Sequence, residues 1–592
     1  MSSLIRLTEQ DEQALRAIEA NIDHHLQAVV GLRRRLNSFV HINRLPSELL
    51  AEIFLLCQDL DGGWELSKFP SGGSDRQHIA LSHRWVLITT VCYHWRKLAI
   101  QTPRFWSRIN LAYPRFAHYS LRLAKKSPLC LETIGLGDTH RSLLDEIVSH
   151  DFRRVSSIRW YFLHQDIVCS GSPLRAESSI VFSQLRSISV ISASTRQDIL
   201  PLFANVDFPT IQTLDLVNCV GNIPPCLLAP TLRTLSLIVM YGSQRVAFVH
   251  FFRCLSQMKQ LTSIELLGID FGQNQETTWP QISLPHLRQA IIYPPSNGHE
   301  NYIPLLHSLA IPLTTHLNLD FSRLQISIAH ESLLLLLSFF HGHVRSSDFR
   351  TIVLRDAGVL VIELWEDALD PAIFATNPPR PSYSLTLPSN SLQQNPLWDM
   401  LTHLFELDNV ETLRCVGSTH SFTVDQEWRR LLRPCHALKI LILEGCDSTA
   451  FIESLDRDTK PDWNLDGGDI NDESDPSLRL PVAPNLKALH LDHISWELES
   501  MQGGQSFHGL LSTMAYRINA GHPIQDVHIT RCLNVNEDRI ADLREKLGEV
   551  MDGAEVHWDG HEEYEQRATG GSGISLVYLN PSDRQPSDDD WY

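Results

Sequence analysis

Hydrophobic residues near the amino end recur at the spacing of one face of a helix. They alternate in steps of three and four residues, with one histidine in the series: Leu15, Ile18, Ile22, His25, Val29, Leu32, Leu36 and Phe39. This spacing is the seam of a heptad repeat. We therefore expect an amphipathic helix over residues 1–40. It is either a coiled coil that joins two copies of the chain through residues 11–40, or a single helix that packs on the segment after it.

A second hydrophobic pattern returns many times further along the chain. In each copy a leucine or isoleucine precedes alternating apolar residues, as in Leu185-Arg-Ser-Ile-Ser-Val, Ile211-Gln-Thr-Leu-Asp-Leu and Leu232-Arg-Thr-Leu-Ser-Leu. Later copies begin near Leu261, Leu287, Leu313, Val410, Leu438 and Leu486. The anchors from Leu185 to Leu287 lie roughly 21 to 29 residues apart, which is the period of leucine-rich repeats.

Each copy predicts a strand whose alternate side chains enter a shared core, followed by a turn and a return segment that is often helical. One repeat cannot bury its leucines alone, so neighbouring repeats stack. The predicted fold over residues 111–558 is an α/β repeat solenoid of leucine-rich-repeat type, with parallel strands on its concave face. Cys219 and Cys446 follow two of these strands and are expected to be buried structural residues.

Two insertions and a tail interrupt this pattern. Near residues 350–395, Thr351–Leu354 and Gly358–Leu364 predict a β-hairpin-like pair within an insertion that shapes the concave side. Residues 456–477 are rich in aspartate and do not follow the ligand order of a calcium loop, so a solvated, disordered insertion is expected. Residues 537–558 predict a terminal helix and a closing strand. A disordered acidic tail is expected over residues 559–592.

Two short apolar helices are predicted within residues 41–110. Pro46 stands where the first helix would begin, and Leu49, Leu50, Ile53 and Phe54 then form a broad apolar stripe. The second helix carries Val91, Trp95, Leu98 and Ala99 and ends before Pro103. Two short helices with so much apolar surface need a third element or a partner.

These residues resemble the F-box. The resemblance rests on Leu45-Pro-x-Glu-Leu-Leu-x-Glu-Ile-Phe54, then Val91-Cys-x-x-Trp-Arg-x-Leu-Ala99, then Thr102-Pro-Arg-Phe-Trp106. More narrowly, the sequence looks like the F-box proteins that are multiplied in fungi, in which the box precedes leucine-rich repeats. The resemblance implies a three-helix module that docks a Skp-family adaptor and thereby joins a cullin–RING ubiquitin ligase.

The resemblance also implies which side chains contact the adaptor: Leu45, Pro46, Leu49, Ile53, Val91, Cys92, Trp95 and Leu98. Leu50, Phe54 and Trp106 are expected instead in the core of the module. One departure is a Gly/Ser/Asp-rich insert over residues 58–78, between the two helices. We expect a harmless surface loop, because flexible insertions cost little closure entropy. The alternative is that the insert weakens docking.

Composition sets limits on the partners. A formal charge of −19 and a pI near 5.8 argue against a chain-wide grip on nucleic acid or on anionic membrane, since both need a basic surface. The 11 cysteines form no Cys-x-x-Cys pair, and the first residues do not form a signal peptide. These features predict free thiols and a cytoplasmic or nuclear location, or both.

Motifs for catalysis are not found in the sequence. It contains no P-loop, no His-Glu-x-x-His and no Gly-x-Ser-x-Gly, and its 28 histidines are scattered. We therefore expect no catalytic residues, no metal and no cofactor. Three hypotheses follow: a substrate receptor of a ubiquitin ligase, a repeat scaffold with a vestigial box, and, least favoured, an enzyme whose site lies within residues 350–480.

Overall fold

The computed structural model describes most of the chain, which divides into two units, Met1–Leu232 and Arg233–Tyr592. With short gaps inside some ranges, the described residues are 9–61, 84–134, 143–162, 180–192, 203–219, 223–239, 244–271, 281–295, 302–322, 335–342, 349–372, 379–388, 407–417, 425–455, 482–496, 506–550, 555–567 and 574–578. Among the helices in these ranges, none combines the length and apolar content needed to cross a bilayer.

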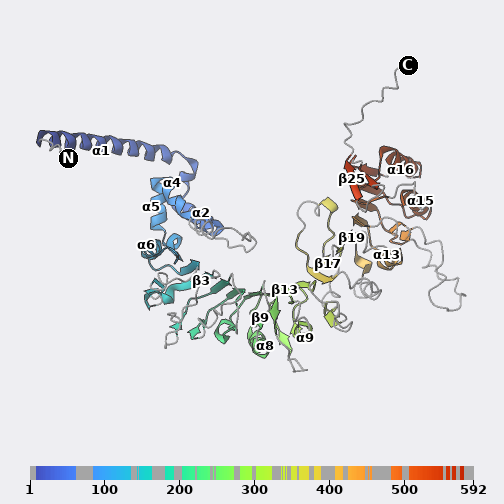
Figure 1. Cartoon of the computed structure of the whole chain (residues 1–592), viewed down its shortest axis with the longest axis horizontal. Helices are drawn as coiled ribbons and strands as arrows, with labels where there is room; N and C mark the ends of the chain where they lie inside the picture. Colours follow the sequence, from blue (N-terminus) through green and yellow to red (C-terminus); the bar gives the residue numbers. More distant parts are fainter. Residues whose placement is uncertain are drawn as a thin grey trace, which may run out of the picture. The chain divides into compact units, whose positions relative to one another are not determined.

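The first unit begins with helices (Figure 1). They are α1 (Glu9–Ser38), η1 (His41–Arg44), α2 (Ser47–Asp61), η3 (Arg84–Leu87), α4 (Ile88–Val91), α5 (Tyr93–Gln101) and η4 (Pro103–Trp106). Pro46 directly precedes α2, and its carbonyl accepts the Leu50 N–H at 3.1 Å. Proline suits this end of a helix because no backbone N–H donor is needed there. At α5 the Cys92 Sγ accepts the Trp95 N–H at 3.5 Å and caps the helix.

An aromatic core holds these helices together. Trp85 lies edge-on to Phe105 with ring centroids 4.7 Å apart, and Trp106 donates its Nε1–H to the Ala99 carbonyl at 2.7 Å. Leu50, Phe54 and Trp106 are all buried. The prediction that these three side chains form the core of the module is therefore confirmed.

The predicted insert begins too early. Helix α2 runs to Asp61, and Gln58 is buried, with its side-chain amide donating to the Phe105 carbonyl at 3.1 Å. Gln58 follows Leu50 and Phe54 at a spacing of four residues, so it lies on the same buried face of the helix. A polar side chain is tolerated there because its amide has a hydrogen-bond partner. The rest of the predicted insert, from residue 62, lies outside the described residues.

The remainder of the first unit is a parallel sheet. Its strands pair in chain order: β1 (Arg108–Asn110), β2 (Leu129–Ile134), β3 (Val155–Phe162), β5 (Ser187–Ser192) and β7 (Thr213–Val217). The other elements are α6 (Pro114–Ala124), η5 (Phe152–Arg154), the paired β4 (Ile180–Val181) and β6 (Val206–Asp207), and η8 (Pro225–Leu227). The register sets Ile188 beside Leu214, so buried positions of successive strands form continuous rows.

The second unit also contains a mostly parallel sheet. Its strands neighbour one another in the order β8 (Thr234–Ile238), β10 (Ser263–Leu267), β13 (Gln289–Tyr293), β15 (His316–Asp320), β18 (Tyr383–Pro388), β17 (Val359–Trp365), β16 (Thr351–Asp356), β19 (Thr412–Gly417), β20 (Ile440–Glu444), β21 (Ala488–Asp492), β22 (Asp526–Thr530) and β23 (Glu555–Trp558).

Along the chain, helices and short strand pairs connect these strands. They are β9 (Gln244–Arg245) with β11 (Ile269–Asp270), β12 (Ile282–Ser283) with β14 (Leu309–Ala310), η11 (Leu407–Asn409), α8 (Phe248–Gln257), α9 (Tyr302–Ser308), α13 (Asp425–Leu432), α15 (Ser506–Asn519) and α16 (Glu537–Val550). Helices α8 and α9 lie on the same side of the neighbouring strands (Figure 1). The predicted terminal helix and closing strand are confirmed as α16 and β23.

The segment predicted as an insertion near residues 350–395 is instead part of the sheet. The predicted hairpin is confirmed, since β16 and β17 pair antiparallel, but β18 also pairs with β17 and then runs parallel to β15. Strand β16 pairs parallel with β19. The strand direction reverses twice, and each of these three strands is hydrogen-bonded to a neighbour on both sides. The sheet therefore continues through the segment.

The tail expectation is also wrong in part. Strands β24 (Glu563–Arg567) and β25 (Ile574–Tyr578) form an antiparallel pair. Residues 579–592 and the predicted acidic insertion at 456–477 lie outside the described residues. Cys219 and Cys446 are buried. The Cys219 Sγ donates to the Val190 carbonyl on β5 and the Cys446 Sγ donates to the Cys415 carbonyl on β19, each at 3.4 Å, so the structural prediction for them is confirmed.

Candidate functional site

Helix α2 presents two different faces. Leu50, Phe54 and Gln58 form a buried face, four residues apart. The opposite face carries an apolar row at the same helical spacing, which we call the α2 stripe: Leu49, Ile53, Leu56 and Leu60. Leu49 is 55% exposed, Leu56 61% and Leu60 84%, while Ile53 is half-buried. The module therefore has a complete core and an additional apolar surface.

None of the eight residues predicted to contact an adaptor is buried. Pro46, Leu49 and Val91 are exposed. The other five are half-buried: Leu45, Ile53, Cys92, Trp95 and Leu98. They come from the start of α2, its outward face, the end of α4 and helix α5, and the ring contact between Phe54 and Trp95 brings α2 and α5 together.

Trp95 has a structural role as well as an exposed edge. Its ring lies 5.1 Å from the Phe54 ring, and its Nε1–H donates to the Asn43 Oδ1 at 2.5 Å. The indole thus ties η1, α2 and α5 together. Because of these contacts, its replacement would alter both the surface and the packing beneath it.

Sequence reasoning missed part of this surface. Leu56, Leu60, Leu87 and Tyr93 are all exposed large apolar residues in the same module. The first two could have been found, because they continue the row of Leu49 at helical spacing beyond the matched motif. The Tyr93 ring lies 3.9 Å from the Arg34 guanidinium, a contact to α1 that no local pattern indicates.

The second unit carries a row of stacked imidazoles on the face of the sheet opposite its buried leucines. The register sets His490 on β21 beside His528 on β22, and His528 beside His557 on β23. The first two rings lie 4.1 Å apart at 3°, and the next pair 4.4 Å apart at 19°. We call these three residues the histidine ladder.

Two imidazoles of the ladder have lowered pKa values. Burial, with a contribution from the neighbouring His528, lowers the pKa of His490 to about 4. Burial also lowers the pKa of His528, and His557 acts in the same direction. Asp370 opposes the shift at His490, while Asp526 and Glu555 oppose it at His528.

An apolar cluster adjoins the ladder. Ile442 on β20 pairs in register with His490, and it packs with Val353, Trp365 and Leu369, with Ile440 at the edge. Arg414 on β19 lies in register with Ile442 and donates to Glu444 in the next row at 2.5 Å, and Asp492 in that next row accepts from Arg531. The imidazoles and the paired charges beside them can bind a polypeptide, and they include no positioned nucleophile.

One group of residues around these ion pairs has a geometry that could hold a metal. Ligand atoms of Glu444, Asp492 and His493 lie within 4.8 Å of one another. However, Arg531 Nε donates to Asp492 Oδ1 at 2.9 Å and Thr530 Oγ1 donates to the same oxygen at 3.0 Å. A cation would have to displace this guanidinium, so the donor set fits an ion pair better than a metal centre.

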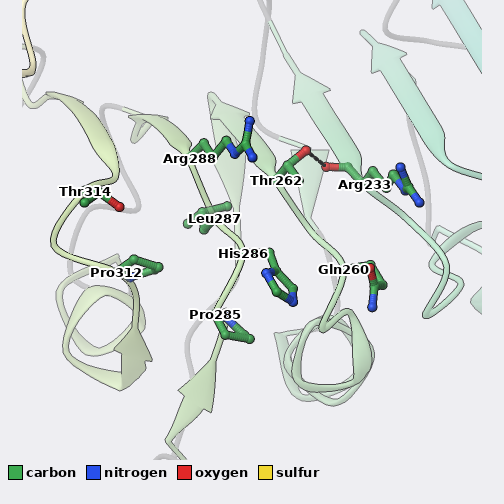
Figure 2. Close-up of a pocket in the computed structure, with 9 residues that line it drawn as sticks. All are labelled: Arg233, Gln260, Thr262, Pro285, His286, Leu287, Arg288, Pro312 and Thr314. Atoms are coloured by element: carbon green, nitrogen blue, oxygen red, sulfur yellow. Dashed lines mark hydrogen bonds between the residues drawn. The ribbon is translucent and has the colours of Figure 1, made fainter.

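A groove of about 310 Å³ lies where four successive segments enter their strands. Figure 2 shows Arg288, Thr262 and Arg233 side by side, with the Thr262 hydroxyl donating to the Arg233 carbonyl at 2.9 Å. The lining includes two arginines and no carboxylate: Arg233, Gln260, Thr262, Pro285, His286, Leu287, Arg288, Pro312 and Thr314. Exposed guanidinium groups in such a groove suit an acidic segment of a partner.

Three of the thiols are poorly suited to nucleophilic catalysis. Burial raises the pKa of Cys130 and of Cys226 to about 11, and that of Cys435 to about 12. Protonated thiols of this kind are weak nucleophiles and weak metal ligands.

No family model matches the chain, and no curated protein matches it significantly.

Proposed function

We propose that the chain is the substrate-recognition subunit of a Skp–cullin–F-box ubiquitin ligase. In this proposal it is non-catalytic. Residues 41–110 bind a Skp-family adaptor, and the strands that follow are the repeats of an α/β leucine-rich-repeat solenoid that binds a protein target. The observation that carries the proposal is the α2 stripe, which lies outside a core that is already complete.

The energetics of α2 favour a partner. Burying an exposed leucine contributes roughly 1.5–3 kcal/mol in full, and about half of that where the side chain is already half covered. Leu49, Leu56 and Leu60 gain only part of this stabilisation within their own module, because more than half of each remains exposed. A helical partner that covers the stripe together with Val91 and the edge of Trp95 would gain the rest.

The target would bind along the histidine ladder, where His490 and His528 are half-buried and His557 is exposed. These side chains project from one face of β21–β23, with the ion pairs of Glu444 and Asp492 at their border. Neutral imidazoles can both stack and accept or donate hydrogen bonds, which suits a polypeptide with aromatic and polar side chains. In this role the protein acts in the cytoplasm, the nucleus or both.

The experiment that tests the proposal is co-purification of a Skp-family adaptor with the full chain. Leu49→Asp and Leu56→Asp place a charge on the α2 stripe without touching Leu50 or Phe54, and each should weaken adaptor binding on the order of tenfold or more. Leu313→Asp is the matched control, since Leu313 is 49% exposed and lies in the second unit. It should bind the adaptor as well as the unmodified chain does.

Circular dichroism should show that all three variants keep the native content of helix and strand. Failure of the unmodified chain to bind any adaptor would support the alternative, a leucine-rich-repeat scaffold with a vestigial box. Undiminished binding by a folded Leu49→Asp, Leu56→Asp double variant would show that the stripe is not the docking surface.

A further inference from the structure

Helix α1 is 30 residues long and buries none of its side chains. At about 1.5 Å per residue it extends about 45 Å. The apolar residues of its heptad seam are 45–69% exposed, which leaves one continuous apolar row along the helix. Its carboxyl end contacts the helical module through Arg34 over the Tyr93 ring and through the Asn37 carbonyl, which accepts from Asn43 Nδ2 at 2.7 Å. Packing of the seam on the following segment, one of the two alternatives that the sequence leaves open, is therefore not observed.

We propose that α1 pairs with α1 of a second copy of this chain as an antiparallel two-helix coiled coil. The heptad repeat sets the layers. The a positions are Leu15, Ile22, Val29 and Leu36, and the d positions are Ile18, His25 and Leu32, with Phe39 next in the series one residue after the helix ends. In an antiparallel pair each a residue faces a d residue, so all four a positions find a d partner, from Leu15 with Phe39 at the ends to Val29 with His25 at the centre.

The residues that flank the seam decide the direction. In a parallel pair each g position faces the next e position, which would set Ala14 beside Glu19 and Ala28 beside Arg33. The charges of Glu19 and Arg33 would then face only alanine methyl groups. A parallel pair would also place the two His25 imidazoles in one layer.

The antiparallel arrangement gives both charges a partner. There, e positions face e positions, so Glu19 of each copy lies opposite Arg33 of the other, on both sides of the twofold axis. Leu26, also at an e position, meets its own counterpart near the axis. The g positions bring Ala28 to Ala28, with no like charges opposed. Charge complementarity and the apolar pair at the axis therefore select a second, antiparallel copy as the occupant of the seam.

This arrangement has a consequence for binding. Two copies joined through α1 present two helical modules and two histidine ladders. A target with two sites, or a target that is itself a dimer, would be held with a higher effective affinity than a single copy provides. The inference rests on the seam and its flanking charges alone, so it stands or falls independently of adaptor binding.

Charge reversal in the full chain tests both pairing and direction. Sedimentation velocity over a range of concentrations should show a dimer for the unmodified chain. Glu19→Arg and Arg33→Glu, each alone, oppose like charges at two symmetric positions and should weaken the dimer on the order of tenfold. The double variant Glu19→Arg with Arg33→Glu restores opposite charges and should recover the original dimer constant.

The control is Asp23→Arg, which reverses a charge on α1 away from the seam and should leave the dimer constant unchanged. Ile22→Asp with Leu36→Asp should give monomers that still bind the adaptor as the unmodified chain does, which separates a failed dimer from a failed module. A monomer at every concentration would overturn the proposal. A dimer that neither single reversal weakens, or that the double variant fails to restore, would overturn the antiparallel arrangement.

Discussion

Lowering the pH should loosen the histidine ladder. The pKa of His490 falls from an ordinary value near 6.5 to about 4 in the fold, because burial and the neighbouring His528 disfavour the imidazolium. Between these two values the unfolded segment binds more protons than the folded one. The stability that the neutral His490 imidazole contributes is therefore complete above pH 6.5 and is lost as the pH falls toward 4.

The magnitude follows from the same two pKa values. The whole shift corresponds to an upper limit of about 3 kcal/mol. His490 is only half-buried, so solvent screening reduces the effect, and we expect a loss of about 1 kcal/mol between pH 7 and pH 5. The lowered pKa of His528 adds to the loss in the same direction.

Hydrogen exchange of the β21 and β22 peptides, corrected for the intrinsic pH dependence of exchange, measures this loss locally. In the unmodified chain the opening free energy should fall by about 1 kcal/mol more than it does in His490→Phe, which keeps a stacked ring but cannot take up a proton. His316→Phe on β15, outside the ladder, should behave like the unmodified chain. Equal pH dependence in the unmodified chain and in His490→Phe would refute the reasoning.

Three further predictions concern stability and are read from thermal or denaturant unfolding of the full chain. Glu132→Gln removes the partner of the buried Arg108, whose Nε lies 2.6 Å from the Glu132 carboxylate, and should cost about 3–5 kcal/mol; a neutral result would show that the pair contributes nothing. Gly268→Ala should cost at least about 2 kcal/mol, since its φ is +67° and a Cβ would lie 2.3 Å from the Val239 carbonyl oxygen, whereas Gly31→Ala in α1 meets no atom within 4 Å and should stabilise the helix by roughly 0.5–1 kcal/mol. Trp95→Ala should cost about 2–4 kcal/mol, because it removes the Phe54 contact and the hydrogen bond to Asn43, while Trp95→Phe should cost about 1 kcal/mol; equal costs would mean that the ring contact does not stabilise the module.

Periodicity was sufficient to predict the elements whose signal is local. The α1 heptads, the stripes of α2 and the alternating strands all depend on residues a few positions apart, and they were found where the spacing is regular. Strands β16 and β17 were recognised as a hairpin, but β18 and the place of all three strands within the sheet were not. Sheet membership depends on pairing between β18 and β15 and between β16 and β19, and no sequence pattern encodes these partners.

The histidine ladder lay beyond sequence reasoning for the same reason. His490, His528 and His557 are three of 28 histidines, and the stretches of chain that separate them differ in length. Only the register of three successive strands sets them side by side. The buried pair of Arg108 with Glu132 is similar, because β1 and β2 place the two side chains together across an intervening helix.

The two exposed apolar surfaces of the helical region differ in the partner that they can accept. The α1 seam is narrow and runs from Leu15 to Leu36, so a single partner helix would cover it, and Glu19 and Arg33 beside it are complementary to a second copy of the helix. The α2 stripe occupies a helix of only 15 residues, which is too short for a stable coiled coil, but Val91 and the edge of Trp95 on neighbouring elements widen it. A broad, short apolar surface fits a partner that supplies more than one element. In these two proposals the same apolar chemistry would serve two different contacts, and the length and width of each surface, rather than its hydrophobicity, would determine which partner it binds.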